Sequence, residues 1–323
     1  MVLVFAEASQ KVFKKACFEA VSYGASLARS LNVPCTAIVL GDAEQPEQLG
    51  VYGASTVYHV ADARLNNLNS GAYTKAIVQV AKNKGASVLV FSNNNTAKAV
   101  APRVAAALQA GLVAGAVALP NLEQGFVVKK SVFSGKAFAY VNIQSPIKVI
   151  SLTPNSTGIH AEGSPAGIEA MNVEFADRDF AVQVVSVSKV SGTVPLSEAE
   201  LVVSGGRGLK GPENWGILEA LANELGATLA CSRPVADSHW RPHHEHVGQT
   251  GGTIRPNLYV AVGISGAIQH LAGVNSSKTI VVINKDPEAP FFKAADYGIL
   301  GDAFEVLPRL TESVKKFKAA QNA

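Results

Sequence analysis

Short apolar, β-branched runs alternate with Ala-rich stretches over the first third of the chain. The runs predict strands at Val2–Ala6, Cys35–Leu40, Val57–Val60 and Val88–Ser92. In the Ala-rich stretches apolar residues recur every three or four positions, which predicts helices at Phe13–Leu31, Ala72–Asn83 and Ala97–Leu108. Strands that alternate with helices favour a parallel sheet covered by helices on both faces.

The pattern changes after Leu119, where strand-like runs follow one another with little helix between them. These runs are Gly125–Val132, Phe138–Ile143, Val149–Leu152 and Phe180–Val187. We expect them to extend or flank the first sheet. Residues Thr153–Gly167 are rich in Pro, Asn, Ser, Gly and Thr, and we interpret them as a long surface loop.

A second alternating unit starts near Glu200. It has predicted strands at Leu201–Ser204, Ala227–Cys231, Leu258–Val262 and Thr279–Ile283. Helices are predicted at Trp215–Leu225, in a segment ending at Leu271, and from Glu305 or Thr311 to Ala320. We place the domain boundary near Ser191–Pro195, giving domains at 1–190 and 191–323. The expected fold is therefore a two-domain α/β protein, with a parallel-sheet domain carrying extra strands followed by a doubly wound domain.

The amino-acid composition is typical of a folded protein with a large core, and it argues against several classes of protein. Of the 323 residues, 48% are hydrophobic and 16% charged, which argues against disorder. A net charge of +3 is too small for a nucleic-acid binder or a polybasic membrane binder. Cys17, Cys35 and Cys231 lie far apart, which argues against a disulfide framework, an iron–sulfur cluster or a zinc finger. Free thiols fit a reducing compartment.

The sequence also suggests where the protein resides. The chain begins Met-Val-Leu-Val-Phe-Ala, which is strand-like and lacks a basic region of the kind that opens a signal peptide. No apolar run reaches the roughly 18 residues that a membrane span needs. We therefore expect a soluble cytoplasmic protein without stable membrane insertion. The alternative is a mitochondrial matrix protein whose presequence has been removed.

Two predicted strands of the second domain run into glycine-rich turns, Ser204–Gly208 and Gly263–Gly266. Ligands of open α/β sheets bind outside the carboxyl ends of the strands, where glycines let backbone amides approach a phosphate. In the first turn Arg207 is a candidate partner for a diphosphate, or a solvated turn arginine. In the second, Ser265 is a candidate helix cap, and a purely structural strand–helix turn is the alternative to ligand binding.

Two segments resemble nucleotide-binding motifs but fail in detail. Gly273–Thr279 has no glycine before Lys278 and leads into a strand rather than a helix, unlike a P-loop. Asn284–Pro287 resembles a guanine-binding motif, but Pro287 replaces its final aspartate. A GTPase or ATPase is therefore not expected.

A histidine-rich loop raises the question of metal binding or catalysis. The loop contains His239, His243, His244 and His246. These residues lack the carboxylate–histidine or cysteine spacing of a metal helix, so hydrogen bonding at the surface is the alternative to a metal site. A hydrolase is poorly supported too, since Ser265 and His270 have no evident orienting aspartate.

Taken together, the second-domain segments resemble the α subunits of electron-transfer flavoproteins. The resemblance covers most of 200–310 and rests on the blocks Val203–Gly208, Ser232–Arg233, Val247–Gly251, Leu258–Gly273, Ile283–Pro290 and Ala295–Gly298. It implies an electron carrier rather than a substrate-converting enzyme. It further implies a heterodimer with a β subunit, one FAD held mainly by the second domain of α, and AMP in β. Acyl-CoA and related dehydrogenases would supply electrons, as in fatty-acid β-oxidation, and a quinone-linked oxidoreductase would accept them.

The resemblance also implies which residues contact FAD. They are Arg207, Ser232, Arg233, Val247, Gly248, Gln249, Thr250, Ser265, Gly266, Ala267, Ile268, Gln269, His270, Asn284 and Asp302. Arg233 would place its guanidinium against the isoalloxazine, the Thr250 hydroxyl would face N5, and His270 would approach the C2 carbonyl. Asn284 and Asp302 would lie toward the adenosine. A permanent cation near the N1–C2=O edge would stabilise the negative charge that reduction puts there.

The chain departs from the family pattern at a few positions. Gly252 occupies the position after Gln249–Gly251 at which family members commonly have a lysine. His243, His244 and His246 lie in a loop that usually has fewer histidines. These differences bear on the redox potential and the partner surface rather than on FAD binding. Two other functions stay open. One is a subunit of an electron-bifurcating, NADH-oxidising complex with a second FAD in β, and the other is a nucleotide-binding sensor without redox work.

Overall fold

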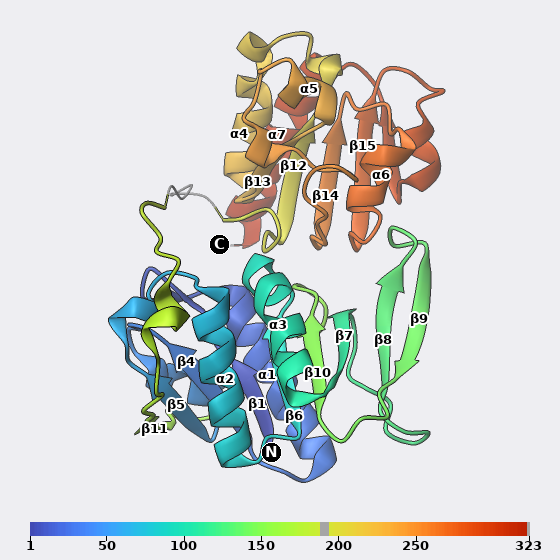
Figure 1. Cartoon of the computed structure of the whole chain (residues 1–323). Helices are drawn as coiled ribbons and strands as arrows, with labels where there is room; N and C mark the ends of the chain where they lie inside the picture. Colours follow the sequence, from blue (N-terminus) through green and yellow to red (C-terminus); the bar gives the residue numbers. More distant parts are fainter. Residues whose placement is uncertain (188–193, 322–323) are drawn as a thin grey trace. The chain divides into compact units, whose positions relative to one another are not determined.

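The computed structural model describes residues 1–187 and 194–321 and divides the chain into two compact units. The first comprises Met1–Val132 and Phe138–Lys189, and the second comprises Phe133–Ala137 and Val190–Ala323 (Figure 1). Residues 191–193 of the expected boundary at Ser191–Pro195 lie outside the described part of the chain. Among the helices described, none has the length and apolar character needed to cross a membrane.

The first unit is built on a large, mostly parallel sheet. Its strand order is β11-β5-β4-β1-β6-β10-β7-β8-β9, and β8 pairs antiparallel with β7. The strands are β1 (Val2–Phe5), β4 (Cys35–Leu40), β5 (Thr56–Val60), β6 (Val88–Ser92), β7 (Gly111–Ala116), β8 (Val127–Val132), β9 (Ala137–Asn142), β10 (Lys148–Leu152) and β11 (Gly167–Ala170). A separate small ribbon joins β2 (Ala8–Ser9) to β3 (Val12–Phe13).

Helices cover both faces of this sheet, as the alternation predicts. They are α1 (Lys15–Leu31), α2 (Ser70–Lys84) and α3 (Asn95–Leu108), with short 3-10 turns η1 (Pro46–Tyr52), η2 (Ala63–Leu65) and η3 (Asp177–Phe180). Successive strand residues point to opposite faces. Val2 and Val4 accordingly join the core that contains α1, whereas Leu3 and Phe5 join the core beneath α2 and α3.

Some details of the first unit differ from the prediction. Phe180–Val187 does not form a strand, because this segment pairs with no strand of the sheet, and Val182 and Val185 are 79% and 97% exposed. The edge position beside β5 is taken by β11 instead, at the end of the predicted loop. The first helix begins at Lys15, because Phe13 belongs to β3. The strand β7 was not predicted.

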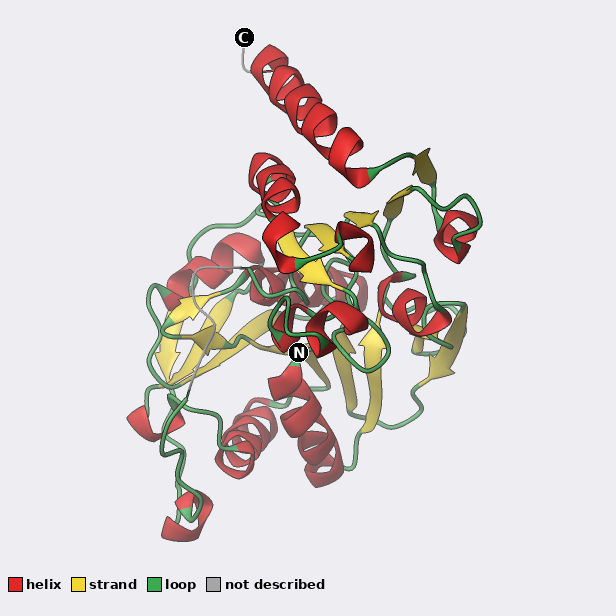
Figure 2. Ribbon diagram, turned by 90° about the horizontal axis from the view of Figure 1, so that it is seen from above, coloured by secondary structure: helices red, strands yellow, loops and turns green. Residues whose placement is uncertain are grey.

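The second unit is a doubly wound parallel sheet with strand order β13-β12-β14-β15-β16. The strands are β12 (Leu201–Gly205), β13 (Thr228–Cys231), β14 (Leu258–Val262), β15 (Thr279–Asn284) and β16 (Tyr297–Leu300). The helices are α4 (Gly216–Leu225), α5 (Arg233–Asp237), α6 (Ile268–Val274) and α7 (Ala303–Gln321), with 3-10 turns η4 (Arg207–Leu209), η5 (Pro212–Asn214), η6 (His243–Glu245) and η7 (Pro290–Ala294). Helix α7, which ends beside the C-terminus in Figure 2, starts earlier than expected.

The strand order of the second unit creates a place for a ligand. After β12 the chain builds β13 on one side of it and then crosses over to build β14 on the other side. The loops that follow β12 and β14 leave the sheet in opposite directions. They therefore separate at the carboxyl ends of these two strands. Such a switch point is where open α/β sheets bind their ligands.

Candidate functional site

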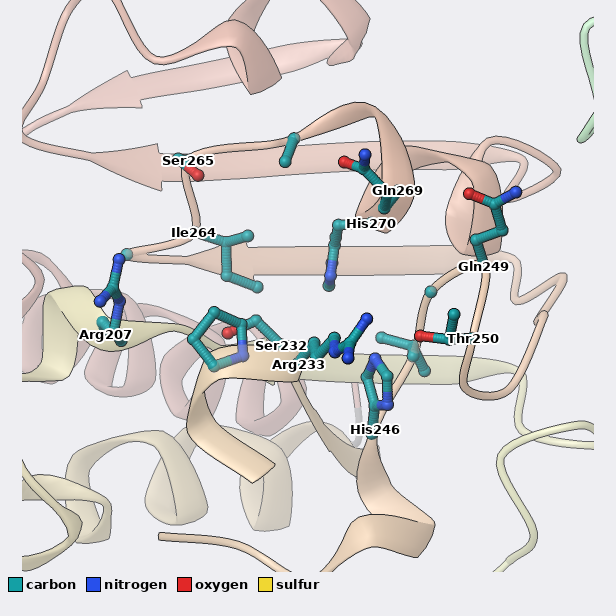
Figure 3. Close-up of a pocket in the computed structure, with 15 residues that line it drawn as sticks. Arg207, Ser232, Arg233, His246, Gln249, Thr250, Ile264, Ser265, Gln269 and His270 are labelled. Carbon is teal, nitrogen blue, oxygen red and sulfur yellow. The ribbon is translucent and has the colours of Figure 1, made fainter. Parts of the chain in front are cut away.

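A pocket of about 420 Å³ lies at this switch point, within the size range of small-molecule sites. Figure 3 shows side chains from the loops after β13 and β14 facing one another across it. The lining residues are Arg207, Ser232, Arg233, Pro234, His246, Val247, Gly248, Gln249, Thr250, Gly263, Ile264, Ser265, Ala267, Gln269 and His270. The loops that follow β12, β13 and β14 therefore build one common cavity.

The glycine-rich turns after β12 and β14 pack against each other, backbone to backbone. Gly208 donates its N–H to the Gly263 carbonyl at 3.0 Å, and a Cβ added to Gly208 would lie 2.6 Å from Gly263 Cα. Gly263 also has a positive φ of 61°, which favours glycine. These glycines lock the two turns together and hold Arg207, which lies between Gly206 and Gly208, at the edge of the pocket.

The segment after β13 supplies a second cation to the pocket. Ser232 occupies the cap position of α5, and Arg233 is the first residue of that short helix. Arg233 Nε lies 3.3 Å from Asp237 Oδ2, and the two side chains are 62% and 53% exposed. The arginine therefore brings a permanent positive charge to the pocket, in a position that solvent still reaches.

Backbone hydrogen bonds fix the segment that contains Val247–Thr250, one within the segment and one to α6. Gly252 N donates to the His246 carbonyl at 2.9 Å, and Gln249 N donates to the Gln269 carbonyl at 2.7 Å. The second bond joins this segment to Gln269 in the first turn of α6. The Thr250 and Gln249 side chains thus line the pocket from a segment whose backbone is fixed by hydrogen bonds (Figure 3).

Arg241 anchors the start of this segment to the body of the domain. Its Nε and Nη2 atoms donate to both Glu245 carboxylate oxygens at 2.7 Å, and Nη1 lies 2.9 Å from Glu219 Oε1. The two carboxylates raise the pKa of the guanidinium, with the Glu245 hydrogen bond as the main cause. The guanidinium also lies over the Trp215 ring, 5.6 Å from its centroid. Glu245 immediately precedes His246, so this network fixes where the pocket wall begins.

His270 lines the pocket as a buried, neutral imidazole. Its Nε2 atom lies 2.7 Å from the hydroxyl of Tyr259 on β14. Burial, and to a lesser extent the nearby His246, lowers the pKa of His270 to about 4. Its Nδ1 atom is buried and has no hydrogen-bond partner in the described part of the protein. A buried polar atom without a partner is rare in native proteins and is explained when a ligand supplies the partner.

The side chains of the histidine-rich loop are not grouped like a set of metal ligands in the part of the chain that the structure describes. No three His, Cys, Asp or Glu side chains are grouped there so that they could bind a metal ion. His239 and His243 lie edge to edge, with ring centroids 6.3 Å apart, and neither lines the pocket. His246 does line it and is buried, and burial is the main cause that lowers its pKa.

The pocket brings most of the residues implied by the resemblance together. They are Arg207, Ser232, Arg233, Val247, Gly248, Gln249, Thr250, Ser265, Ala267, Gln269 and His270. Pro234, His246, Gly263 and Ile264 also line it and were not on that list. Pro234, His246 and Ile264 are each adjacent in sequence to a residue that was on it, and Gly263 opens the glycine-rich turn of Gly263–Gly266, so sequence position is the signal that could have identified them.

The remaining implied residues lie outside the pocket lining. A Cβ on Gly266 would meet Phe291, and Ile268 is 61% exposed. Asn284 Nδ2 donates to the Ile264 carbonyl at 3.0 Å, and Asp302 accepts the Phe304 N–H at 2.9 Å.

The expectation that Ser265 caps a helix is wrong. Helix α6 begins only at Ile268, and Ala267 occupies its cap position without a side-chain hydrogen bond. The turn of Gly263–Gly266 therefore ends before the helix starts. Ser265 is left free of that role and is one of the residues that line the pocket.

The chemistry of the lining suits FAD. Arg207 and Arg233 offer guanidinium groups to a diphosphate or a negatively charged ring edge. Thr250 offers a hydroxyl, and His270 offers the ring nitrogen that lacks a partner. A ring system rich in carbonyl and nitrogen acceptors, joined to a diphosphate, matches this set of donors and cations.

Comparisons with known proteins identify the family. Residues 2–177 match the electron transfer flavoprotein domain, and residues 195–275 match the electron transfer flavoprotein FAD-binding domain. The chain is 37% identical to electron transfer flavoprotein subunit alpha of Bacillus subtilis, over 98% of this chain and 97% of the relative. It is 36% identical to the subunit of that name from Thermoanaerobacterium thermosaccharolyticum, over 98% of each chain. It is 34% identical to Protein FixB of Clostridium saccharobutylicum, over 99% of this chain and 98% of the relative. The chain therefore belongs to the electron transfer flavoprotein α-subunit family, and its second unit carries the FAD-binding domain of that family.

Proposed function

We propose that this chain, paired with a β subunit, holds FAD in the switch-point pocket and relays electrons from acyl-CoA and related dehydrogenases to a quinone-linked oxidoreductase. Bound FAD supplies the redox chemistry, and the protein positions and tunes it. The observation that carries the proposal is the pocket itself, which brings together Arg233 and Thr250 from the segment after β13 and His270 from the segment after β14. Among the described residues, His270 Nδ1 has no hydrogen-bond partner. The family relationship supports the same assignment.

In this proposal Arg233 tunes the potential of the bound flavin. Its fixed charge stabilises negative charge that reduction places on the ring, and it cannot be neutralised by loss of a proton. Two features moderate the effect. The side chain is more than half exposed, so water and salt screen the charge, and Asp237 lies 3.3 Å away with the opposite sign.

Thr250 and His270 act through hydrogen bonds rather than charge. Because the pKa of His270 is about 4, the imidazole is neutral near pH 7 and contributes a donor without adding a positive charge. We assign its donor to the C2 carbonyl and the Thr250 hydroxyl to N5 of the flavin. Thr250 follows Gln249 and His270 follows Gln269, and the backbone hydrogen bond from Gln249 N to the Gln269 carbonyl ties these two segments together.

The rest of the dinucleotide would extend along the carboxyl edge of the sheet. Arg207 and the turn of Ser265–Ile268 lie after β12 and β14 and are assigned to the diphosphate region. Asn284 is the last residue of β15, and Asp302 follows β16 and precedes α7. Their positions at the ends of the next strands support the assignment of both to the adenosine end.

Co-purification with the β subunit tests this function. We expect a yellow pair that contains one FAD, is reduced stepwise by dithionite and is reduced by an acyl-CoA dehydrogenase with its substrate. A second FAD, in β, together with reduction by NADH would favour an electron-bifurcating complex instead. A colourless pair that takes up no added FAD would contradict the proposal.

A further inference from the structure

We propose that Tyr259 is a positioning residue of the pocket, whose hydroxyl donates to His270 Nε2 and thereby keeps the imidazole proton on Nδ1, where it is offered to FAD. The inference rests on the proposed function, because it concerns how the chain prepares one donor for that cofactor. It assigns a role to a residue that does not itself line the pocket.

The geometry of the pair is fixed by packing on the α6 face of the sheet. Tyr259 lies within β14, is fully buried, and stacks on Phe291 with ring centroids 6.3 Å apart. Phe291 also contacts the edge of His270, at 5.7 Å between centroids. The three rings therefore hold the hydroxyl of Tyr259 at 2.7 Å from His270 Nε2.

Counting donors and acceptors decides which atom carries the proton. If Nε2 carried it, the Tyr259 oxygen would accept from it, and the Tyr259 O–H would be left to donate to the buried Ser204 Oγ. The Ser204 hydroxyl hydrogen would then have no acceptor in the described part of the chain. His270 Nδ1 would also be left as a bare buried acceptor. If Nδ1 carries the proton, the Tyr259 O–H is satisfied by Nε2, and one N–H remains. That single N–H is the group a carbonyl oxygen of the flavin would satisfy, so this tautomer has the lower cost.

The protonation states of both groups support this assignment. Burial raises the pKa of Tyr259 far above its ordinary value; a hydrogen bond from the Ser204 hydroxyl opposes this and Cys231 adds slightly to it, so the phenol keeps its hydrogen. Burial and His246 lower the pKa of His270, so the imidazole has one hydrogen rather than two. Each partner thus holds one hydrogen near pH 7, which is what the donor count assumes.

A fixed tautomer matters because the two tautomers have opposite effects on a carbonyl. An Nδ1–H group attracts the carbonyl oxygen of the flavin, whereas a bare Nδ1 lone pair repels it. Without the Tyr259 hydroxyl, the imidazole is free to place its proton on either nitrogen, and part of the donor strength is lost. Tyr259 would therefore act through His270 on the flavin, without touching it.

The test uses Tyr259→Phe in the FAD-loaded αβ pair, since this change keeps the ring and removes only the hydroxyl. We expect the C2=O vibration of FAD labelled with ¹³C at C2 to rise in frequency, and the first reduction potential to become more negative. Tyr297→Phe, at a side chain that is 66% exposed on β16, is the matched control and should change neither. An unchanged vibration and potential in Tyr259→Phe would overturn the inference.

Two further measurements separate positioning from packing. In a His270→Ala background, Tyr259→Phe should add no further shift, because its effect passes through the imidazole; an equal shift in that background would overturn the proposal. ¹⁵N NMR of the wild-type pair, with labelled histidine in α, should show His270 protonated at Nδ1, and protonation at Nε2 would contradict it. A wild-type pair that binds no FAD would overturn the proposed function, and the inference with it.

Discussion

Arg233 and Asp237 form an ion pair along one turn of α5, with Arg233 Nε 3.3 Å from Asp237 Oδ2. Arg233 lines the pocket, whereas Asp237 does not. The charge on this side of the pocket is thus the sum of the Arg233 guanidinium, which lines the pocket, and the Asp237 carboxylate, which does not. Under the proposed function, the carboxylate therefore moderates the effect of the arginine on the flavin.

Asp237→Asn should make the first reduction potential of the bound flavin more positive. The change removes a negative charge near Arg233 while keeping the size of the side chain. Because both groups are largely exposed, the effect should correspond to a surface ion pair, on the order of 10–40 mV. Arg233→Ala is the matched change of opposite sign and should shift the potential to more negative values. Potentiometric titration of both FAD-loaded pairs measures this, and shifts of the same sign would refute the account.

Gly273→Ala should destabilise the pocket wall. Gly273 lies in α6, and a Cβ there would lie 2.5 Å from the backbone N and Cα of Gly248, which borders the pocket. We expect a loss of about 1–3 kcal/mol in the free energy of unfolding and weaker retention of FAD. Gly216→Ala is the control, because a Cβ at this helical position meets no atom within 4 Å. Denaturant unfolding and the ratio of FAD to protein would show the difference, and equal behaviour of the two variants would count against the packing argument.

Acidification should destabilise the flavin-free protein through His270. The pKa of His270 is about 4 in the folded protein, whereas in the unfolded chain it returns to about 6.5. Between these values the unfolded state binds more protons, so the stability that this residue contributes is present above pH 6.5 and is lost as the pH falls toward 4. From pH 7 to pH 5 the loss is about 2 kcal/mol. Urea unfolding should show this loss in the wild type and a smaller one in His270→Gln, and an identical pH dependence would contradict the assignment.

Thr250→Val should alter the absorption spectrum of the bound flavin. The substitution keeps the shape of the side chain and removes the hydroxyl that we assign to N5. Thr253→Val is a suitable control, because Thr253 is exposed in the same segment and does not line the pocket. Visible spectra of the FAD-loaded pairs should differ from wild type for Thr250→Val alone. If both variants match the wild type, Thr250 does not contact the flavin ring.

The fold was predictable wherever hydrophobic periodicity was strong. The runs that form β1, β4 and β14 are buried along almost their whole length. Their uninterrupted apolar residues therefore predict buried strands. Phe180–Val187 has the same local character, but no neighbouring strand pairs with it, and tertiary context decided against a strand. Conversely, β7 contains two glycines and was missed, because its stability comes from pairing with β10 rather than from its own residues.

The site was predictable as a set of sequence blocks but not as a geometry. Glycine turns after strands point to the carboxyl edge of the sheet, and that edge is where the pocket lies. The role of His246 as a pocket residue could not be separated from its histidine neighbours, because only the loop path distinguishes it from His243. The Tyr259–His270 hydrogen bond joins a strand residue to a helix residue, and no local sequence pattern encodes such a pairing.

A structure of the FAD-loaded αβ pair tests the central claim most directly. The account predicts the isoalloxazine in the pocket at the carboxyl ends of β12, β13 and β14, within contact distance of Arg233, Thr250 and His270. Flavin density at a different place on the chain, or a pocket filled by side chains while FAD lies on the β subunit, would contradict it.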